Sequence, residues 1–284
     1  MKNLSLLVAG LAGLSFVVGG CDSDPDPAGD RSVAIQFGAV VGAEVAACGQ
    51  SYSGIGTSSS TISPKDLRFY VHGVHLIDAS GKQIPVALTV DGKWQDDSVA
   101  LLDFEDKTGN CDNGTSDVND QVVGTVPDGD YVGMGFTLGV PAEKNHQDAA
   151  TAASPLNITG LFWNWTGGYK HARLDIVSTG QATGWNVHLG ATACAEDTAV
   201  QTVVCENGNR TVVRMDAFDV DSDVVNIDLA AMLENSDVDV NGAPASGCMS
   251  GADDPECAAI FGAFGLSIKG SEAPMQSVFA KATR

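Results

Sequence analysis

Alternation of hydrophobic and polar residues dominates the chain from about residue 32 onward. Val33, Ile35, Phe37, Ala39 and Val41 occupy every second position. Similar runs cover residues 67–77, 86–90, 99–104, 132–138, 161–165, 169–176, 185–189, 211–215, 224–229 and 277–281. A period of two is typical of half-buried strands, because successive side chains point to opposite faces of a strand. The pattern predicts an all-β protein.

Turn-forming segments separate these runs and set the expected architecture. DASGK at 78–82, DGKW at 91–94, PDGD at 127–130 and TGGY at 166–169 are rich in Gly and Asp. Many short strands separated by such turns favour an antiparallel β-sandwich-like single domain. Two short helices are also expected. One covers 229–233 after the N-cap Asp228, and the other covers 258–264 after acidic residues at its positive end.

The first residues have the pattern of an export signal. Lys2 precedes an apolar run over 4–18, which is too short to span a bilayer comfortably, and small residues then precede Cys21. We expect residues 1–20 to be a lipoprotein signal peptide. Residues 21–31 would then be the lipidated Cys21 and a flexible acidic tether, and residues 32–284 the β domain. An ordinary secretory signal with a chance cysteine is the alternative.

The expected location is the periplasmic or cell-surface side of a bacterial membrane, with a lipid anchor at Cys21. The formal net charge of −21 argues against nucleic acid or an anionic membrane surface as a partner, so membrane contact is expected only through the anchor. The same charge suits a surface that attracts cations or basic partners, or simple solubility.

Six further cysteines predict that the domain is disulfide-bonded. They are Cys48, Cys111, Cys194, Cys205, Cys248 and Cys257. An even count in an exported chain favours three disulfides, for which fifteen connectivities are possible. Nearest-neighbour pairing gives Cys194–Cys205 and Cys248–Cys257 and leaves Cys48–Cys111. Metal–thiolate ligation is the alternative, although the chain has no CxxC pair.

Catalytic motifs are absent, and we expect that the protein is not an enzyme. The sequence has no GxSxG, HExxH or P-loop. The run 219–223 resembles the start of a calcium loop but lacks its glycine and closing glutamate, so we interpret it as a solvated turn, with weak calcium binding as the alternative.

Histidines are scarce, which draws attention to transition metals. His72 and His75 are three apart and would face opposite sides of a regular strand, unless Gly73 forms a bulge. His171 alternates with charged residues and is expected to face solvent. His188 precedes Cys194, and His146 lies in a polar loop.

Two tryptophans, Trp163 and Trp165, are two apart and are expected to share one strand face. Ordinary core packing is the simplest interpretation of such a pair.

Several motifs resemble the MbnP-like proteins, also called metallo-mystery-pair four-Cys-motif proteins. They are RFYVHGVHL at 68–76, VALLDFEDKTGNC at 99–111, GVP at 139–141 with NH at 145–146, SPLNITGLFWNWTGGYKHARLD at 154–175, VHLGATAC at 187–194 and GCMSGADDPEC at 247–257. The resemblance runs in order over nearly the whole domain.

The resemblance implies copper, as Cu(I) or Cu(II), and a partner di-haem cytochrome c peroxidase of the MbnH/MauG type that oxidises one tryptophan to kynurenine. Carried over by motif, His146 and His188 are expected metal ligands and Trp163 or Trp165 the modified residue, with His72 as a third ligand. Met249, beside Cys248, is a further soft donor outside this ligand set, with buried packing as the alternative. The expected role is copper acquisition, storage or delivery.

Two other functions stay open. A structural or adhesive surface lipoprotein would need no metal. An electron-transfer protein is disfavoured, because no free cysteine is expected to provide the thiolate of a blue-copper site.

Overall fold

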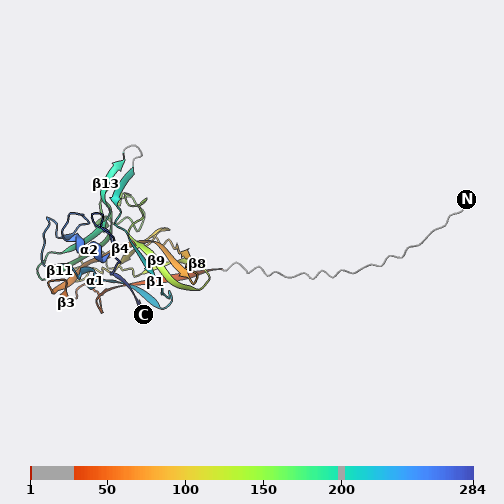
Figure 1. Ribbon diagram of the computed structural model, residues 1–284, viewed down its shortest axis with the longest axis horizontal. Helices are drawn as coiled ribbons and strands as arrows, with labels where there is room; N and C mark the ends of the chain where they lie inside the picture. Colours follow the sequence, from red (N-terminus) through yellow and green to blue (C-terminus); the bar gives the residue numbers. More distant parts are fainter. Residues whose placement is uncertain (2–28, 198–201) are drawn as a thin grey trace.

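Strands make up most of the computed structural model, which describes residues 1, 29–197 and 202–284 (Figure 1). The strands are β1 Asp30–Val41, β2 Glu44–Val45, β3 Tyr52–Ile55, β4 Ser60–Asp78, β5 Gln83–Pro85, β6 Ala87–Leu88, β7 Val99–Asp103, β8 Gln121–Pro127, β9 Tyr131–Leu138, β10 Phe162–Asn164, β11 Gly168–Ser178, β12 Asn186–Gly190, β13 Thr192–Asp197, β14 Thr202–Asn207, β15 Thr211–Met215, β16 Asp223–Asp228, β17 Gly247–Cys248 and β18 Phe279–Thr283. The expected signal peptide, the lipidation of Cys21 and the tether up to residue 28 lie outside the described residues. β1 begins at Asp30, two residues before the expected start of the domain.

The described strands form two large sheets and one separate hairpin. The first sheet has the order β18–β16–β1–β8–β6, with β2 beside β1. The second has the order β15–β9–β4–β11–β12–β17, and β10 pairs with β11 while β3, β5 and β7 pair with β4. Strand neighbours run antiparallel except for the pairs β1–β16 and β12–β17, which run parallel. The all-β class is confirmed.

An aromatic core joins the two sheets. Phe37 of β1 contacts Phe69 of β4 and Phe136 of β9, with ring centroids 6.2 and 5.5 Å apart. Phe279 of β18 packs edge-on against Phe136 at 5.3 Å. In β1, every second residue from Val33 to Val41 is buried, as the alternation predicts. The two sheets therefore bury their facing surfaces against each other as a sandwich.

A second, smaller core covers the outer face of β4 and β11. Tyr70 and Tyr169 pack edge-on there, and the segment 139–162 lies over them. The Tyr70 hydroxyl donates to the Pro155 carbonyl at 3.0 Å, and that of Tyr169 donates to the Leu156 carbonyl at 2.5 Å. This segment carries His146 and leads into β10, so its packing positions the candidate site.

Both predicted helices and all three predicted disulfides are confirmed. Helix α1 covers Leu229–Leu233, and the Asp228 carboxylate accepts from the Ala230 amide at 2.8 Å. Helix α2 covers Cys257–Ala263, and a 3₁₀ turn, η1, covers Thr159–Leu161. The pairs are Cys48–Cys111, Cys194–Cys205 and Cys248–Cys257. No described helix has the length and apolar character needed to cross a membrane.

Several elements differ from the sequence prediction, and the longest of them are β8 and the hairpin of β13 and β14. β8 was not predicted, although it pairs with β1 over seven residues. The hairpin of β13 and β14 was also not predicted, because its residues are mostly polar or exposed and show no hydrophobic alternation. Figure 1 shows β13 standing away from the body of the protein.

Candidate metal centre

His146 lies in a turn-rich loop that is fixed to the second sheet. The Tyr169 amide of β11 donates to the Asn145 carbonyl at 3.1 Å and holds the loop beside the β10–β11 hairpin. The Nδ1 atom of His146 lies 2.8 Å from the Trp165 carbonyl oxygen. A carbonyl can only accept, so Nδ1 donates to it, and the lone pair of Nε2 accepts from the Asn145 side-chain amide at 3.1 Å. A backbone carbonyl on one ring nitrogen is the usual support of a metal-binding histidine.

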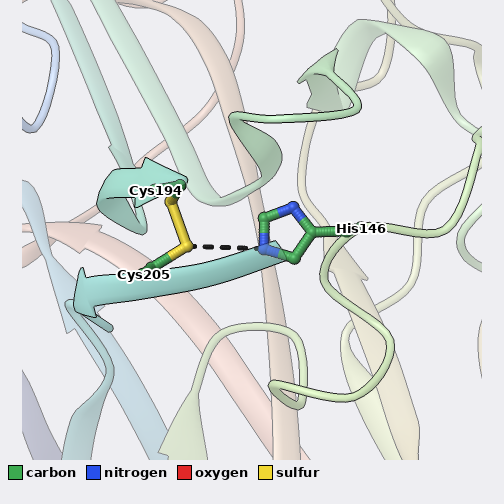
Figure 2. Close-up of side chains that lie close together, drawn as sticks. All are labelled: His146, Cys194 and Cys205. Carbon is green, nitrogen blue, oxygen red and sulfur yellow. Dashed lines mark hydrogen bonds between the residues drawn. A yellow bond between two sulfur atoms is a disulfide. The ribbon is translucent and has the colours of Figure 1, made fainter. Parts of the chain in front are cut away.

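The Nε2 atom of His146 faces the disulfide that joins β13 and β14. It lies 3.4 Å from the Cys205 Sγ atom (Figure 2). One nitrogen of His146 and the two sulfurs of Cys194 and Cys205 lie within 4.8 Å of one another. In the described residues, neither His72 nor His188 belongs to such a group of three donors. No sequence pattern indicated that His146 would meet this disulfide.

Trp165 adjoins His146, whereas Trp163 lies elsewhere. Trp165 is in the turn after β10 and is 41% exposed, so the prediction that both tryptophans lie on a strand is wrong for Trp165. The strand ends early because the β10–β11 register shifts between Phe162 and Asn164. Trp165 and His146 line a hollow of about 260 Å³ together with Glu143. The ring of Trp163 packs against Gly190.

Trp163 lines a separate surface hollow of about 510 Å³. Cys194 and Met249 line the same hollow. The sequence-predicted soft donor Met249 therefore lies near Trp163 rather than with Trp165.

Gly73 forms the bulge that brings His72 and His75 to one side of β4. Its φ angle is +60°, and the β4–β9 register shifts between the two histidines. His72 pairs with Thr137 and His75 with Gly135, so the bulge turns a spacing of three into neighbouring positions on one face. Both histidines line a groove of about 500 Å³ together with Glu143.

The ring orientation of these two histidines resembles that of His146. The Nδ1 atom of His72 donates to the Gly139 carbonyl at 2.7 Å, and that of His75 donates to the Gly73 carbonyl at 2.9 Å. Burial lowers the pKa of His72, although the bond to Gly139 acts in the opposite direction. His72 therefore stays neutral at physiological pH, as a metal ligand requires. Glu143, which the sequence analysis did not single out, lines both this groove and the His146 hollow.

His188 binds a buried carboxylate instead of joining His146. Its Nε2 atom lies 3.1 Å from an oxygen of Asp175, and Arg173 donates to the same carboxylate at 2.8 Å. Arg173 also reaches Asp66, which Arg68 binds with two nitrogens. Burial alone would raise the pKa of Asp175, but bonds from His188 and Arg173 lower it. Asp175 is therefore ionised, and the His188 ring is held within hydrogen-bond distance of it.

His171 is buried, so the prediction that it faces solvent is wrong. Its Nε2 atom donates to the Gly208 carbonyl at 3.0 Å, and its Nδ1 accepts from the Val140 amide at 3.3 Å. Burial, followed by the nearby charge of Arg210, lowers the pKa of His171 to about 3. The alternation did place it on the outer face of β11, but the segment 139–162 and the end of β14 cover that face.

The fold and its rim define a disulfide-bonded β-sandwich protein with histidine donors beside a tryptophan. A protein-family profile described as MbnP matches residues 30–250. The chain therefore belongs to the MbnP family, as its motifs imply. The solved structure "MbnP from Methylosinus trichosporium" is similar, with a TM-score of 0.81 and 32% identity, and the match covers 90% of this chain and 99% of that chain. A search of the curated proteins gave no match.

Proposed function

We propose that this MbnP-family protein is an extracytoplasmic copper-binding lipoprotein, and that a partner di-haem peroxidase of the MbnH/MauG type completes its site by oxidising a tryptophan to kynurenine. In this proposal the protein is the substrate of its partner and not itself an enzyme. Its role is copper acquisition, storage or delivery. The observation that carries the proposal is the bond between His146 and the Trp165 carbonyl, which places a histidine beside an exposed indole and leaves its Nε2 as the donor atom for a metal in place of the Asn145 amide.

The donor chemistry fits copper once the tryptophan is oxidised. An indole nitrogen is only a donor and offers no lone pair to a metal. Kynurenine carries an aryl amine, which together with imidazole nitrogens gives a nitrogen-rich site suited to copper. His146 is the primary ligand in this proposal. His72 and His188 stay as predicted further ligands, and Glu143 is a carboxylate that lines both the groove of His72 and the hollow of His146.

Trp165 is our choice for the modified residue. It is the exposed member of the four tryptophans, whereas Trp185 is fully buried and Trp94 and Trp163 are half-buried. An exposed indole can lie close to a docked haem enzyme, and a short distance favours electron transfer from it. Trp165 also shares its hollow with His146, and Trp163 does not. Sequence alone left the choice between Trp163 and Trp165 open.

The test is co-expression with the haem partner, followed by peptide mass spectrometry and copper analysis. In balanced form, two molecules of hydrogen peroxide add two oxygen atoms to the indole and leave as two waters, and water then removes the formyl group as formic acid. We expect a gain of about 4 Da at Trp165, which creates the amine donor, and stronger copper binding. Trp165→Phe should abolish both effects.

Trp163→Phe is the matched control and should keep both effects. If active partner and peroxide leave Trp163 and Trp165 intact, or modify only Trp94 or Trp185, the copper–kynurenine proposal is wrong. A structural lipoprotein without metal would then be the better description.

A further inference from the structure

The disulfide of the β13–β14 hairpin lies directly against the candidate copper ligand. Cys194 and Cys205 face each other in the hairpin register, and the Sγ atom of Cys205 is 3.4 Å from His146 Nε2. Figure 2 shows the imidazole edge pointing at this sulfur. Because Nδ1 donates to the Trp165 carbonyl, the atom that faces the sulfur holds a lone pair, which accepts from the Asn145 side-chain amide at 3.1 Å and would bind the metal instead.

This disulfide is also the accessible one of the three. The cysteines of the other two disulfides are buried, with exposed fractions of 8% for Cys48, 1% for Cys111 and 0% for Cys248 and Cys257. Cys194 and Cys205 are only half-buried, and the hairpin projects from the body (Figure 1). Thiol–disulfide exchange needs access of the attacking thiolate to a sulfur, so a dithiol should reduce this bond first.

We propose that the Cys194–Cys205 disulfide masks a second metal site, and that its reduction by a dithiol exposes a Cu(I) site formed by Cys194, Cys205 and His146. The dithiol gives two electrons and two protons to the disulfide and becomes a cyclic disulfide itself, while Cys194 and Cys205 become thiols. Binding of one Cu(I) then releases the two thiol protons. The metal keeps its oxidation state throughout.

The hairpin holds the three donors in place after reduction. Backbone pairing extends on both sides of the disulfide, from Thr192 with Asn207 to Asp197 with Thr202. Reduction removes the bond between the sulfurs but leaves these hydrogen bonds. The donor atoms already lie within 4.8 Å of one another, so a metal can replace the covalent bond with small movements. Two thiolates and an imidazole favour the soft ion Cu(I).

This site is separate from the kynurenine site in chemistry but shares His146 with it. Thiolate ligation needs no oxidation of Trp165, so the proposal does not rest on the haem partner. If both sites exist, reduction draws His146 towards the sulfurs and away from the tryptophan-derived amine. The redox state of the hairpin would thereby decide which donor set holds copper.

The test uses the chain with Cys21→Ser, which removes an additional thiol, purified without the haem partner. Native protein is treated with dithiothreitol, desalted under nitrogen and assayed for free thiols and for Cu(I) in competition with bicinchoninate. We expect two thiols, mapped to Cys194 and Cys205, and one Cu(I) per chain that the oxidised protein does not hold. His146→Gln should keep the thiols and weaken Cu(I) binding at least about tenfold, because loss of even a supporting partner costs about 10–100-fold in metal affinity.

His75→Gln is the matched histidine control and should leave Cu(I) binding unchanged. A double variant, Cys194→Ser with Cys205→Ser, should gain no Cu(I) on reduction while its circular dichroism matches the parent protein. The proposal is overturned if native protein resists reduction at this pair, or if the reduced pair binds no additional Cu(I). Equal Cu(I) binding in His146→Gln would remove the histidine from the site.

Discussion

Ring tautomers divide the five histidines into two groups. In His72, His75 and His146, Nδ1 donates to a backbone carbonyl, and Nε2 carries the lone pair, which in His146 accepts from the Asn145 amide. His171 uses both ring nitrogens within the protein, and His188 binds Asp175. The first group has the tautomer and support that metal ligands usually have. Sequence spacing could not show this difference, because the carbonyls belong to bulges and loops.

His188 offers a test that separates a structural role from ligation. His188→Ala removes a hydrogen bond to the fully buried Asp175 carboxylate. Hydrogen bonds to charged groups contribute about 1.5–3 kcal/mol, so we expect the free energy of unfolding of the copper-free protein to fall by that amount. Urea denaturation measures the change, and His188→Gln should recover part of it. An unchanged midpoint combined with lost copper would show that His188 acts as a ligand alone.

His171 should make the protein sensitive to acid. Its folded-state pKa, lowered to about 3 by burial, lies below the ordinary value of 6.5. The unfolded chain therefore binds one more proton here as the pH falls from 6.5 towards 3, and stability should decrease by about 1.4 kcal/mol per pH unit in that window. Above pH 6.5 the contribution of His171 is constant.

The measurement compares His171→Gln with the parent protein by urea denaturation at pH 7, 6, 5 and 4. Gln can replace one of the two hydrogen bonds but does not titrate, so the stability gap between the two proteins should narrow as the pH falls. Burial raises the pKa of Asp103 to about 7, which gives the opposite pH dependence, but this contribution is common to both proteins and cancels. A constant gap would contradict a neutral buried His171.

At the scale of elements, the bulge at Gly73 places both His72 and His75 in the groove beside β4. Gly73 has a φ of +60°, and an added Cβ would meet nothing closer than 3.9 Å. The cost of Gly73→Ala is therefore conformational, and we expect it to destabilise the protein by about 1–2 kcal/mol. Gly262→Ala in α2 is the matched control, because it has free space in a helix and should stabilise by about 0.5–1 kcal/mol. Equal melting temperatures for the two variants would contradict this account.

Strands with a clear alternation of hydrophobic residues could be predicted from the sequence. Strands held mainly by backbone pairing or a disulfide could not. β1, β4, β9 and β11 bury one or both faces, and their alternation located them. The β13–β14 hairpin rests on backbone pairing and a disulfide, so its side chains carry no such period. In β8, the adjacent Val122 and Val123 break the alternation, although Val122 and Val126 are buried.

His146 and the two tryptophans of the candidate site could be named from the sequence, but their contacts could not. The NH and FWxW motifs indicated His146 and the two tryptophans. The contact between His146 and Trp165 depends on the path of the loop after Gly139 across β11. The backbone hydrogen bond from Tyr169 to Asn145 fixes that path. No residue pattern encodes such a path. The position of the Cys194–Cys205 bond against His146 was therefore visible only in the structure.

At the scale of the whole molecule, Phe37 links the two sheets. It is 3% exposed and contacts aromatic rings on both β4 and β9. Phe37→Ala leaves a cavity between the sheets and should lower the free energy of unfolding by about 3–5 kcal/mol. Val212→Ala, at a position that is 73% exposed, should change it by less than about 0.5 kcal/mol. Chemical denaturation checks both, and a small effect of Phe37→Ala would mean that the sheets pack mainly through other contacts.

The parallel pairing of β1 with β16 has a consequence for the order of folding. Gln36 pairs with Val224, so β1, the central strand of the first sheet, is completed only by β16, which lies far along the chain. Contacts of such long sequence separation form slowly, because a large loop must close first. During synthesis, which starts at the N-terminus, β4, β9 and β11 can pair early. At that stage β1 still lacks β16 on one edge. Until β16 is made, that edge presents unpaired backbone groups that another strand could pair with.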